Sequence, residues 1–296
     1  MDQPNDEESA AEPPSLDSNT SWHIDDLLFA PFLFIITVYI CNLARDILLQ
    51  ANVMRLDQVQ KLATAEIIGT FETTVIMFEI NLIVYPLWGV IPYTLLVFIA
   101  LHWQKLRPDE FQYDANPLTI IMKHVEGIGT AGNSYYQRFE FVMIMIWAET
   151  VGAFLSYYYL VNLIWANAHM WGFWDTNNNF HYHLFTTAQE WQASISGDPT
   201  FAAFVEGFFS FAQYVWPLLV IRTGFDGDLT LILINSGKAI FAGCGAQYSG
   251  GYFNPIIAFA LEYKTRGHSL FTKTVVYWIA PIIGTIGGIV TRKWLF

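Results

Sequence analysis

Two asparagine–proline pairs, Asn116-Pro117 and Asn254-Pro255, are the residues of this sequence with the clearest potential for chemistry. Asparagine is a favoured N-cap of α-helices and proline is favoured at the first helical position, so each pair can start a helix abruptly. The cap oxygen then accepts a backbone N–H of its own helix, which leaves amide hydrogens that can donate to a passing oxygen. The apolar run after each pair suffices for about ten helical residues, or about 15 Å, half of a bilayer's hydrocarbon core. The sequence therefore predicts two re-entrant half-helices that line a wet cavity, where irregular backbone is tolerated at membrane depth.

Each pair lies at nearly the same distance from an acid that is embedded in an apolar span. Glu66 precedes Asn116 by 50 residues, and Glu206 precedes Asn254 by 48 residues. Three apolar spans separate one copy from the next, so we expect the copies to lie in opposite orientations across the bilayer. Such an inverted repeat places its site at the interface of the copies, near the midplane. Two helix N-termini facing each other there would raise the energy of cations and of hydronium, but not of a neutral hydrogen-bonding solute.

The elements that position these residues are predicted to be apolar helices. The chain is 54% hydrophobic and 14% charged, and its mean hydropathy is +0.35. Its net charge of −12 and the absence of a basic cluster argue against a nucleic-acid partner. We find no nucleophile–base pair, phosphate-binding glycine loop or zinc pattern, so neither an enzyme nor a cofactor or metal site is expected. Seven spans are predicted, at about 27–43, 62–86, 90–104, 139–165, 200–221, 228–247 and 273–291.

The spans suggest a division of the chain into five parts. These are an acidic tail (1–26) that we expect to be disordered, an extra N-terminal span (27–49), a first inverted repeat (62–165), an outside loop (166–198) and a second inverted repeat (199–293). If the amino terminus is outside, most lysines and arginines fall in cytoplasmic segments, as the positive-inside rule requires.

These residues resemble the aquaporin superfamily, and specifically its divergent superaquaporin branch, over 62–293. The resemblance implies an all-α polytopic membrane protein with six core spans and two half-helices, preceded here by one extra span. It also implies a homotetramer in the lipid bilayer of the endoplasmic reticulum, another intracellular membrane or the plasma membrane. The motifs that carry it are AEIIGTF at 65–71, AETVGA at 148–153, FVEGFFSF at 204–211, SGGYFNP at 249–255 and VYWIAPIIG at 276–284.

The chain departs from the family pattern around both asparagine–proline pairs. Leu118 and Ile256 replace the usual alanine, and Ile257 stands where the family's filter arginine follows the second pair. The filter histidine of water-specific members falls near Ala242, and the superaquaporin cysteine is replaced by Thr265. The resemblance therefore implies a more apolar filter that is less exclusive for water, so that glycerol and hydrogen peroxide are further candidate permeants.

Embedded charges leave alternatives open. Acids inside a membrane span are functional by default and can bind ions or relay protons. The resemblance implies instead that Glu66, Glu206 and Glu149 brace the half-helix loops as buried acceptors. Lys238 is also embedded, and we expect it to pair with one of the embedded acids, Glu72, Glu79 or Glu149.

Three functions follow from these residues. The first is a passive channel for water and small neutral solutes. The second is a structural or homeostatic membrane protein that keeps this fold with little flux, which the large side chains of Leu118, Ile256 and Ile257 make credible. The third is a proton- or ion-coupled transporter that uses the embedded acids.

Overall fold

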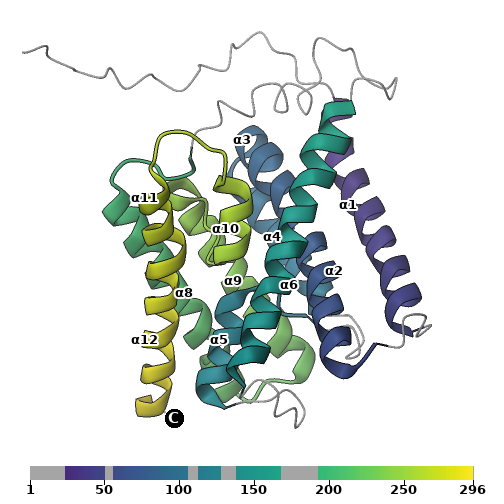
Figure 1. The fold of residues 1–296 in the computed structure, drawn as a ribbon. Helices are drawn as coiled ribbons and strands as arrows, with labels where there is room; N and C mark the ends of the chain where they lie inside the picture. Colours follow the sequence, from purple (N-terminus) through teal and green to yellow (C-terminus); the bar gives the residue numbers. More distant parts are fainter. Residues whose placement is uncertain (1–23, 51–55, 106–112, 128–137, 168–192, 296) are drawn as a thin grey trace, which may run out of the picture.

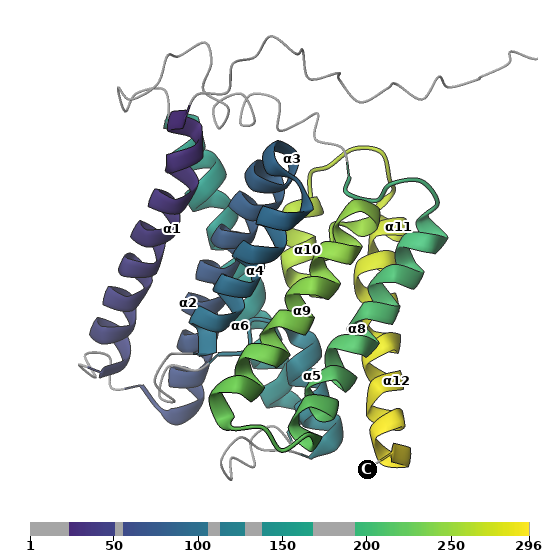
Figure 2. The same cartoon turned by 180° about the vertical axis from the view of Figure 1, so that it is seen from behind.

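The computed structural model describes residues 24–50, 56–105, 113–127, 138–167 and 193–295. All regular elements within these ranges are helices, and they pack side by side as one bundle (Figures 1 and 2). The principal helices are α1 (Ile24–Arg45), α2 (Gln58–Glu79), α3 (Tyr85–Trp88), α4 (Val90–Lys105), α5 (Pro117–Glu126), α6 (Phe139–Tyr157), α8 (Pro199–Arg222), α9 (Gly227–Ser249), α10 (Pro255–Glu262), α11 (Leu270–Thr274) and α12 (Ala280–Leu295).

Within the described residues, six helical stretches are long and apolar enough to cross a membrane. The remaining predicted span, the third at 90–104, corresponds to α4, whose 16 residues are fewer than in any of the six. The described chain starts at one end of the bundle and finishes at the opposite end, as an odd number of crossings requires (Figure 1). The six stretches are Phe29–Leu48, Gln58–Trp88, Phe139–Asn167, Pro199–Arg222, Gly227–Ser249 and Leu270–Trp294.

Short π-helical segments lengthen several of these helices. They are η1 (Asp46–Gln50) after α1, η2 (Ile80–Val84) after α2, η6 (Tyr158–Ile164) after α6, and η8 (Val275–Ile279) between α11 and α12. Most of the predicted acidic tail and of the predicted outside loop, including 1–23 and 168–192, lies outside the described residues.

The outer surface of the bundle is apolar, whereas acids are buried inside it. Ile91 is 80% exposed and Trp147 is 66% exposed, while Glu149 and Glu206 are fully buried. Soluble monomers rarely expose large apolar patches and rarely bury carboxylates. The predicted all-α polytopic fold is therefore confirmed, and the chain is an integral, multi-pass membrane protein whose environment is the lipid bilayer.

The same helix pairing occurs in both halves of the chain. In the first half α2 packs against α6, and in the second half α8 packs against α12. A glycine permits each close approach: Gly152 of α6 lies against the backbone of Ile67, and Gly284 of α12 lies against the backbone of Gly207. Neither glycine has room for a Cβ, which explains why the AETVGA and IAPIIG segments carry glycine at these places.

Candidate functional site at two facing half-helices

The two asparagine–proline pairs start two short helices. The helix α5 has 10 residues and begins at Pro117, and the Asn116 side chain accepts a hydrogen bond from the Leu118 N–H at 3.0 Å. The helix α10 has 8 residues and begins at Pro255. The Asn254 side chain accepts from the N–H groups of Ile256 and Ile257 at 3.1 and 3.3 Å. Each asparagine is thus a side-chain N-cap of its own helix.

The two helix starts face each other across a pair of reciprocal hydrogen bonds. The Asn116 Nδ2 donates to the carbonyl oxygen of Phe253 at 3.1 Å, and the Asn254 Nδ2 donates to the carbonyl oxygen of Ala115 at 2.6 Å. Each amide nitrogen carries two hydrogens, so these bonds use one and leave one. The first half-helix therefore meets the second at its N-terminus, where the positive end of each helix dipole lies.

The residue before each asparagine has an uncommon backbone conformation. Ala115 has φ 47° and Phe253 has φ 45°, and no other non-glycine residue in the described part of the chain has a positive φ. This left-handed region costs an L-residue about 1–2 kcal/mol. Surrounding contacts must therefore hold both residues in place.

A buried carboxylate holds each of these strained turns. Glu66 of α2 accepts from the N–H groups of Asp114 and Ala115 at 2.9 and 3.1 Å. Glu206 of α8 accepts from the N–H groups of Tyr252 and Phe253 at 3.2 and 2.9 Å. In both copies one carboxylate thus receives the two N–H groups that precede the capping asparagine.

Glu149 differs from these two acids. It lies on α6 and is fully buried, but neither of its carboxyl oxygens accepts a hydrogen bond from the described residues. Its electrostatic neighbours include Glu66 of α2, Asp114 of the first loop and the backbone N–H of Asn116, which lies outside strict hydrogen-bond geometry. The expected role of Glu149 in bracing a half-helix loop therefore stays a prediction, and the Asn116 N–H is the backbone group that it would hold.

The far end of α5 is tied to two spans of the other half. The helix ends at Glu126, and Gly127 follows in the left-handed conformation with φ 66°. Glu126 receives a hydrogen bond from the Tyr214 hydroxyl on α8 and forms a 2.7 Å ion pair with Arg292 on α12. The first half-helix is thus held at its start by the second loop and at its end by α8 and α12.

The far end of α10 is held by a polar cluster around Glu262. The Tyr252 hydroxyl donates to the Glu262 carboxylate at 2.9 Å, and so does the Thr265 hydroxyl at 2.9 Å. The Lys273 Nζ donates to the Glu262 carbonyl at 2.9 Å and to the Thr265 hydroxyl at 2.8 Å. Thr265, which replaces the superaquaporin cysteine, therefore takes part in ending this half-helix.

The residues expected to narrow the passage are packed into the protein interior. Asn116 retains partial exposure, but the four apolar positions around the two helix starts are at most 5% exposed. Those positions are Leu118, Ala242, Ile256 and Ile257.

The predicted partnership of Lys238 is wrong for the part of the chain that the structure describes. Lys238 makes no ion pair there, and its charged neighbours are Lys105 and Asp114. Glu72 pairs with Arg45, and Glu79 accepts a hydrogen bond from the Trp165 ring nitrogen at 2.9 Å.

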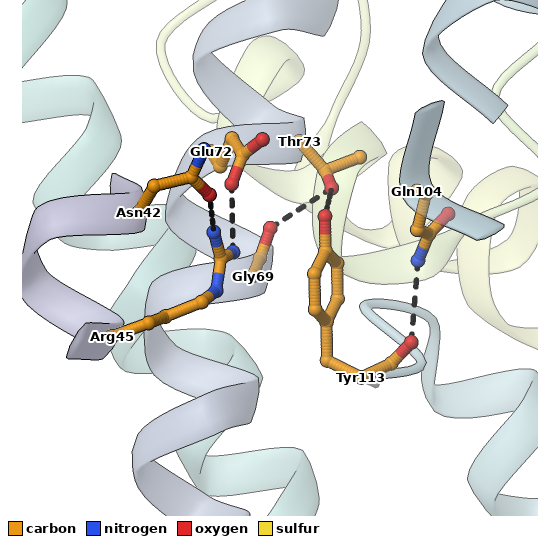
Figure 3. Close-up of polar contacts among 7 residues, drawn as sticks. All are labelled: Asn42, Arg45, Gly69, Glu72, Thr73, Gln104 and Tyr113. Atoms are coloured by element: carbon orange, nitrogen blue, oxygen red, sulfur yellow. Dashed lines mark hydrogen bonds and ion pairs between the residues drawn. The ribbon is translucent and has the colours of Figure 1, made fainter. Parts of the chain in front are cut away.

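Sequence reasoning also missed Arg45 and Tyr113. Figure 3 shows that the Arg45 guanidinium points from α1 toward Glu72 of α2, next to the Tyr113 ring. A lone arginine after an apolar span is an ordinary interfacial charge. The available signal was the spacing of Asn42 and Arg45, which places both side chains on one face of the first helix.

Comparison with known proteins points to one superfamily. No protein-family model matches the chain. Aquaporin SIP1-1 of Zea mays is 34% identical over 105 residues, which are 35% of this chain and 41% of that protein. Aquaporin-11 of Milnesium tardigradum is 49% identical over 41 residues, which are 14% of this chain and 15% of that protein. The chain thus matches less than half of the length of either relative, and the resemblance that its motifs carry is confirmed.

Proposed function

We propose that this chain is a divergent member of the aquaporin superfamily and a passive transmembrane channel for water, a proposal that its similarity to two aquaporins supports. Glycerol and hydrogen peroxide are proposed as further permeants. The observation that carries the proposal is a pair of reciprocal hydrogen bonds. The Asn116 side chain donates to the second loop, and the Asn254 side chain donates to the first. This pair of bonds brings two capped helix N-termini to one point of a membrane protein.

Both electrostatics and hydrogen bonding at this point favour a neutral solute. Each helix N-terminus carries the equivalent of roughly half a positive elementary charge, so a cation or hydronium meets two repulsive ends. The second amide hydrogen of Asn116 and of Asn254 is available to the oxygen of a water, an alcohol or a peroxide. No coupling ion is required, so transport would follow the solute gradient.

In this proposal the surrounding residues have two roles. Glu66 and Glu206 brace the loops, because their carboxylates hold the N–H groups that precede the caps. Four apolar side chains narrow the passage and select among neutral solutes. They are Leu118, Ala242, Ile256 and Ile257.

A second candidate function is a structural or homeostatic membrane protein with little flux. The observation that favours it is the burial of the four apolar side chains, none of which is more than 5% exposed. Tight packing around the two helix starts would close the passage and leave the bundle intact.

Stopped-flow measurements on proteoliposomes decide between the two candidates. We expect fast shrinkage in an osmotic gradient, and its loss in Asn254→Asp, because a carboxylate cannot donate to the Ala115 carbonyl or to a passing oxygen. The matched control is Asn167→Asp, three residues after the end of η6, whose Nδ2 donates to the Leu163 carbonyl in an exposed hydrogen bond; this variant should conduct water as the unmodified protein does. Flux no greater than that of empty liposomes would refute the channel and favour the structural role. A glycerol gradient in the same apparatus tests the second permeant.

We also propose a homotetramer, located in the endoplasmic reticulum, another intracellular membrane or the plasma membrane. Resemblance to the superfamily supports the tetramer, and the apolar outer surface allows helix-to-helix contact within the bilayer. Native mass spectrometry from detergent is the direct measurement, and a monomer at all detergent concentrations would contradict the tetramer.

A further inference from the structure

The extra N-terminal helix carries an arginine that is buried inside the protein. Arg45, in the last turn of α1, is 2% exposed. Its Nη2 lies 2.7 Å from the Oε2 of Glu72 on α2, and its Nη1 donates to the Asn42 side chain at 3.2 Å (Figure 3). Both charges of this ion pair are removed from solvent. Removing one partner of such a pair is strongly unfavourable, because the other charge is left buried and uncompensated.

The same guanidinium lies against an aromatic ring of the first half-helix loop. The central carbon of the Arg45 guanidinium is 5.3 Å from the centre of the Tyr113 ring, within the range of a cation–π contact. The ring lies against Gly69 of α2, where a Cβ would overlap it. The Tyr113 hydroxyl is 3.5 Å from the Thr73 hydroxyl, and the Tyr113 carbonyl accepts from the Gln104 side chain at 3.3 Å.

One face of α2 thus contacts three consecutive residues of the loop. Gly69 and Thr73 contact Tyr113, and Glu66, one turn earlier, receives the N–H groups of the next two residues. Asn116 follows directly and donates to the opposite loop. The position of the Tyr113 ring therefore affects the position of the asparagine cap three residues later.

The arrangement exists in the first copy of the repeat alone. Aligned on the embedded glutamate and on the capping asparagine, the second copy lacks the glycine, the acid and the aromatic ring of the first. The corresponding residues are Phe209, Ala212 and Gly251. The helix α1 packs against α2 at the edge of the bundle, so the additional contacts occur where the additional helix lies (Figures 1 and 2).

We propose that Arg45 is a positioning residue for the first half-helix. Through its ion pair with Glu72 and its contact with the Tyr113 ring, α1 holds the loop so that the Asn116 amide reaches the Phe253 carbonyl. The helix α1 then contributes to the geometry of the site. The inference rests on the proposed channel function for its permeability readout, but the structural readout does not depend on flux.

Hydrogen exchange of the full-length protein in lipid nanodiscs, read by mass spectrometry, gives the structural test. In Arg45→Gln we expect the amides of Asp114 and Ala115 to exchange about ten- to a hundredfold faster, the loss of a buried charge-assisted bond being of that size. The amides of Tyr252 and Phe253, held by Glu206, should be unchanged and serve as the internal reference. Arg266→Gln, at an exposed arginine, is the matched control. Unchanged exchange of Asp114 and Ala115 in Arg45→Gln would overturn the inference.

Further variants separate positioning from general stability. Arg45→Lys keeps the charge without the planar fork, so it should retain part of the protection. Reversal of the pair in the double variant Arg45→Glu with Glu72→Arg should restore protection relative to either single variant. Tyr113→Leu leaves the Arg45–Glu72 ion pair intact, so no buried charge loses its partner, and we expect the amides of Asp114 and Ala115 to exchange faster in it. Tyr113→Phe keeps the ring face, so the exchange of these two amides should not change in it. Release by Tyr113→Phe as large as by Tyr113→Leu would overturn the role of the ring.

The permeability arm distinguishes this inference from the proposed function. If the protein conducts water, Arg45→Gln should lower the permeability per folded protein and change the ratio of glycerol to water flux, because the cap is displaced. If no preparation conducts water but the two amides are released, the proposed channel fails and the positioning role stands. If the protein conducts water and the amides are unaffected, the positioning role fails and the channel stands.

Discussion

The glutamates that hold the strained turns give the sharpest stability prediction. In Glu206→Gln one carboxylate oxygen becomes an NH₂ group. If the nitrogen replaces Oε2, the Phe253 N–H loses its acceptor. If it replaces Oε1, the Tyr252 N–H and the Ser249 hydroxyl lose theirs. In either orientation of the new side-chain amide, its NH₂ group therefore faces at least one buried backbone N–H, which is also a donor.

The expected size follows from the number of unmet donors. One buried N–H without a partner costs about 1–3 kcal/mol. Apparent melting temperature falls by about 2–4 °C for each kcal/mol in a protein of roughly this size. Glu66→Gln leaves the N–H of Asp114 or of Ala115 unmet, so a similar loss is expected in the first copy.

The assay is thermal unfolding of the purified protein in one detergent, followed by tryptophan fluorescence. The control is Glu140→Gln, in the first turn of α6, where the acid is exposed and the same chemical change should alter the melting temperature little. If Glu206→Gln and Glu66→Gln have the same melting temperature as Glu140→Gln, the carboxylates do not hold the turns and the reasoning is refuted.

Three other changes test neighbouring parts of the structure. Gly69→Ala should destabilise by about 1–3 kcal/mol relative to Gly287→Ala, because overpacking against the Tyr113 ring has that cost, whereas an added Cβ at Gly287 meets its nearest atom at 3.6 Å. Equal melting temperatures would contradict the close contact between Gly69 and the Tyr113 ring. Lys273→Met should destabilise by about 1–3 kcal/mol by leaving carbonyl acceptors at the end of α10 unmet, whereas exposed Lys293→Met should have no effect on the melting temperature. Ile257→Arg should lower the ratio of glycerol to water flux, and an unchanged ratio would remove Ile257 from the constriction.

Local rules were sufficient for the helices themselves. The predicted span 200–221 corresponds to Pro199–Arg222, because a long apolar run bounded by Asp198 and Arg222 has few alternatives in a membrane. The starts of both half-helices follow from cap and proline preferences, which depend on adjacent residues alone. The reciprocal bonds between the loops need the packing of the two halves, and no local pattern encodes them.

Charged residues inside the bundle were predicted less well. An arginine at the end of an apolar span fits the positive-inside rule, so Arg45 gave no reason to expect burial. Its partner depends on the rotation of α1 against α2, and the sequence of neither helix contains that angle. The partner of Lys238 was wrongly predicted for the same reason, since hydropathy places a charge along a span but not on a face. The π-helical turns were also missed, because no composition signal marks them.

The reciprocal bonds between the two loops can form only late in the synthesis of the protein. Asn116 and its acceptor Phe253 are 137 residues apart, and Asn254 and its acceptor Ala115 are 139 apart. At about 5–20 residues per second, the first loop waits roughly 7–30 seconds on the ribosome before its acceptor is made. During this interval the first half is inserted with an unfinished loop, to which its own glutamate is the available partner. The two halves therefore complete each other late, so a chain interrupted between them leaves two fragments that each need the other.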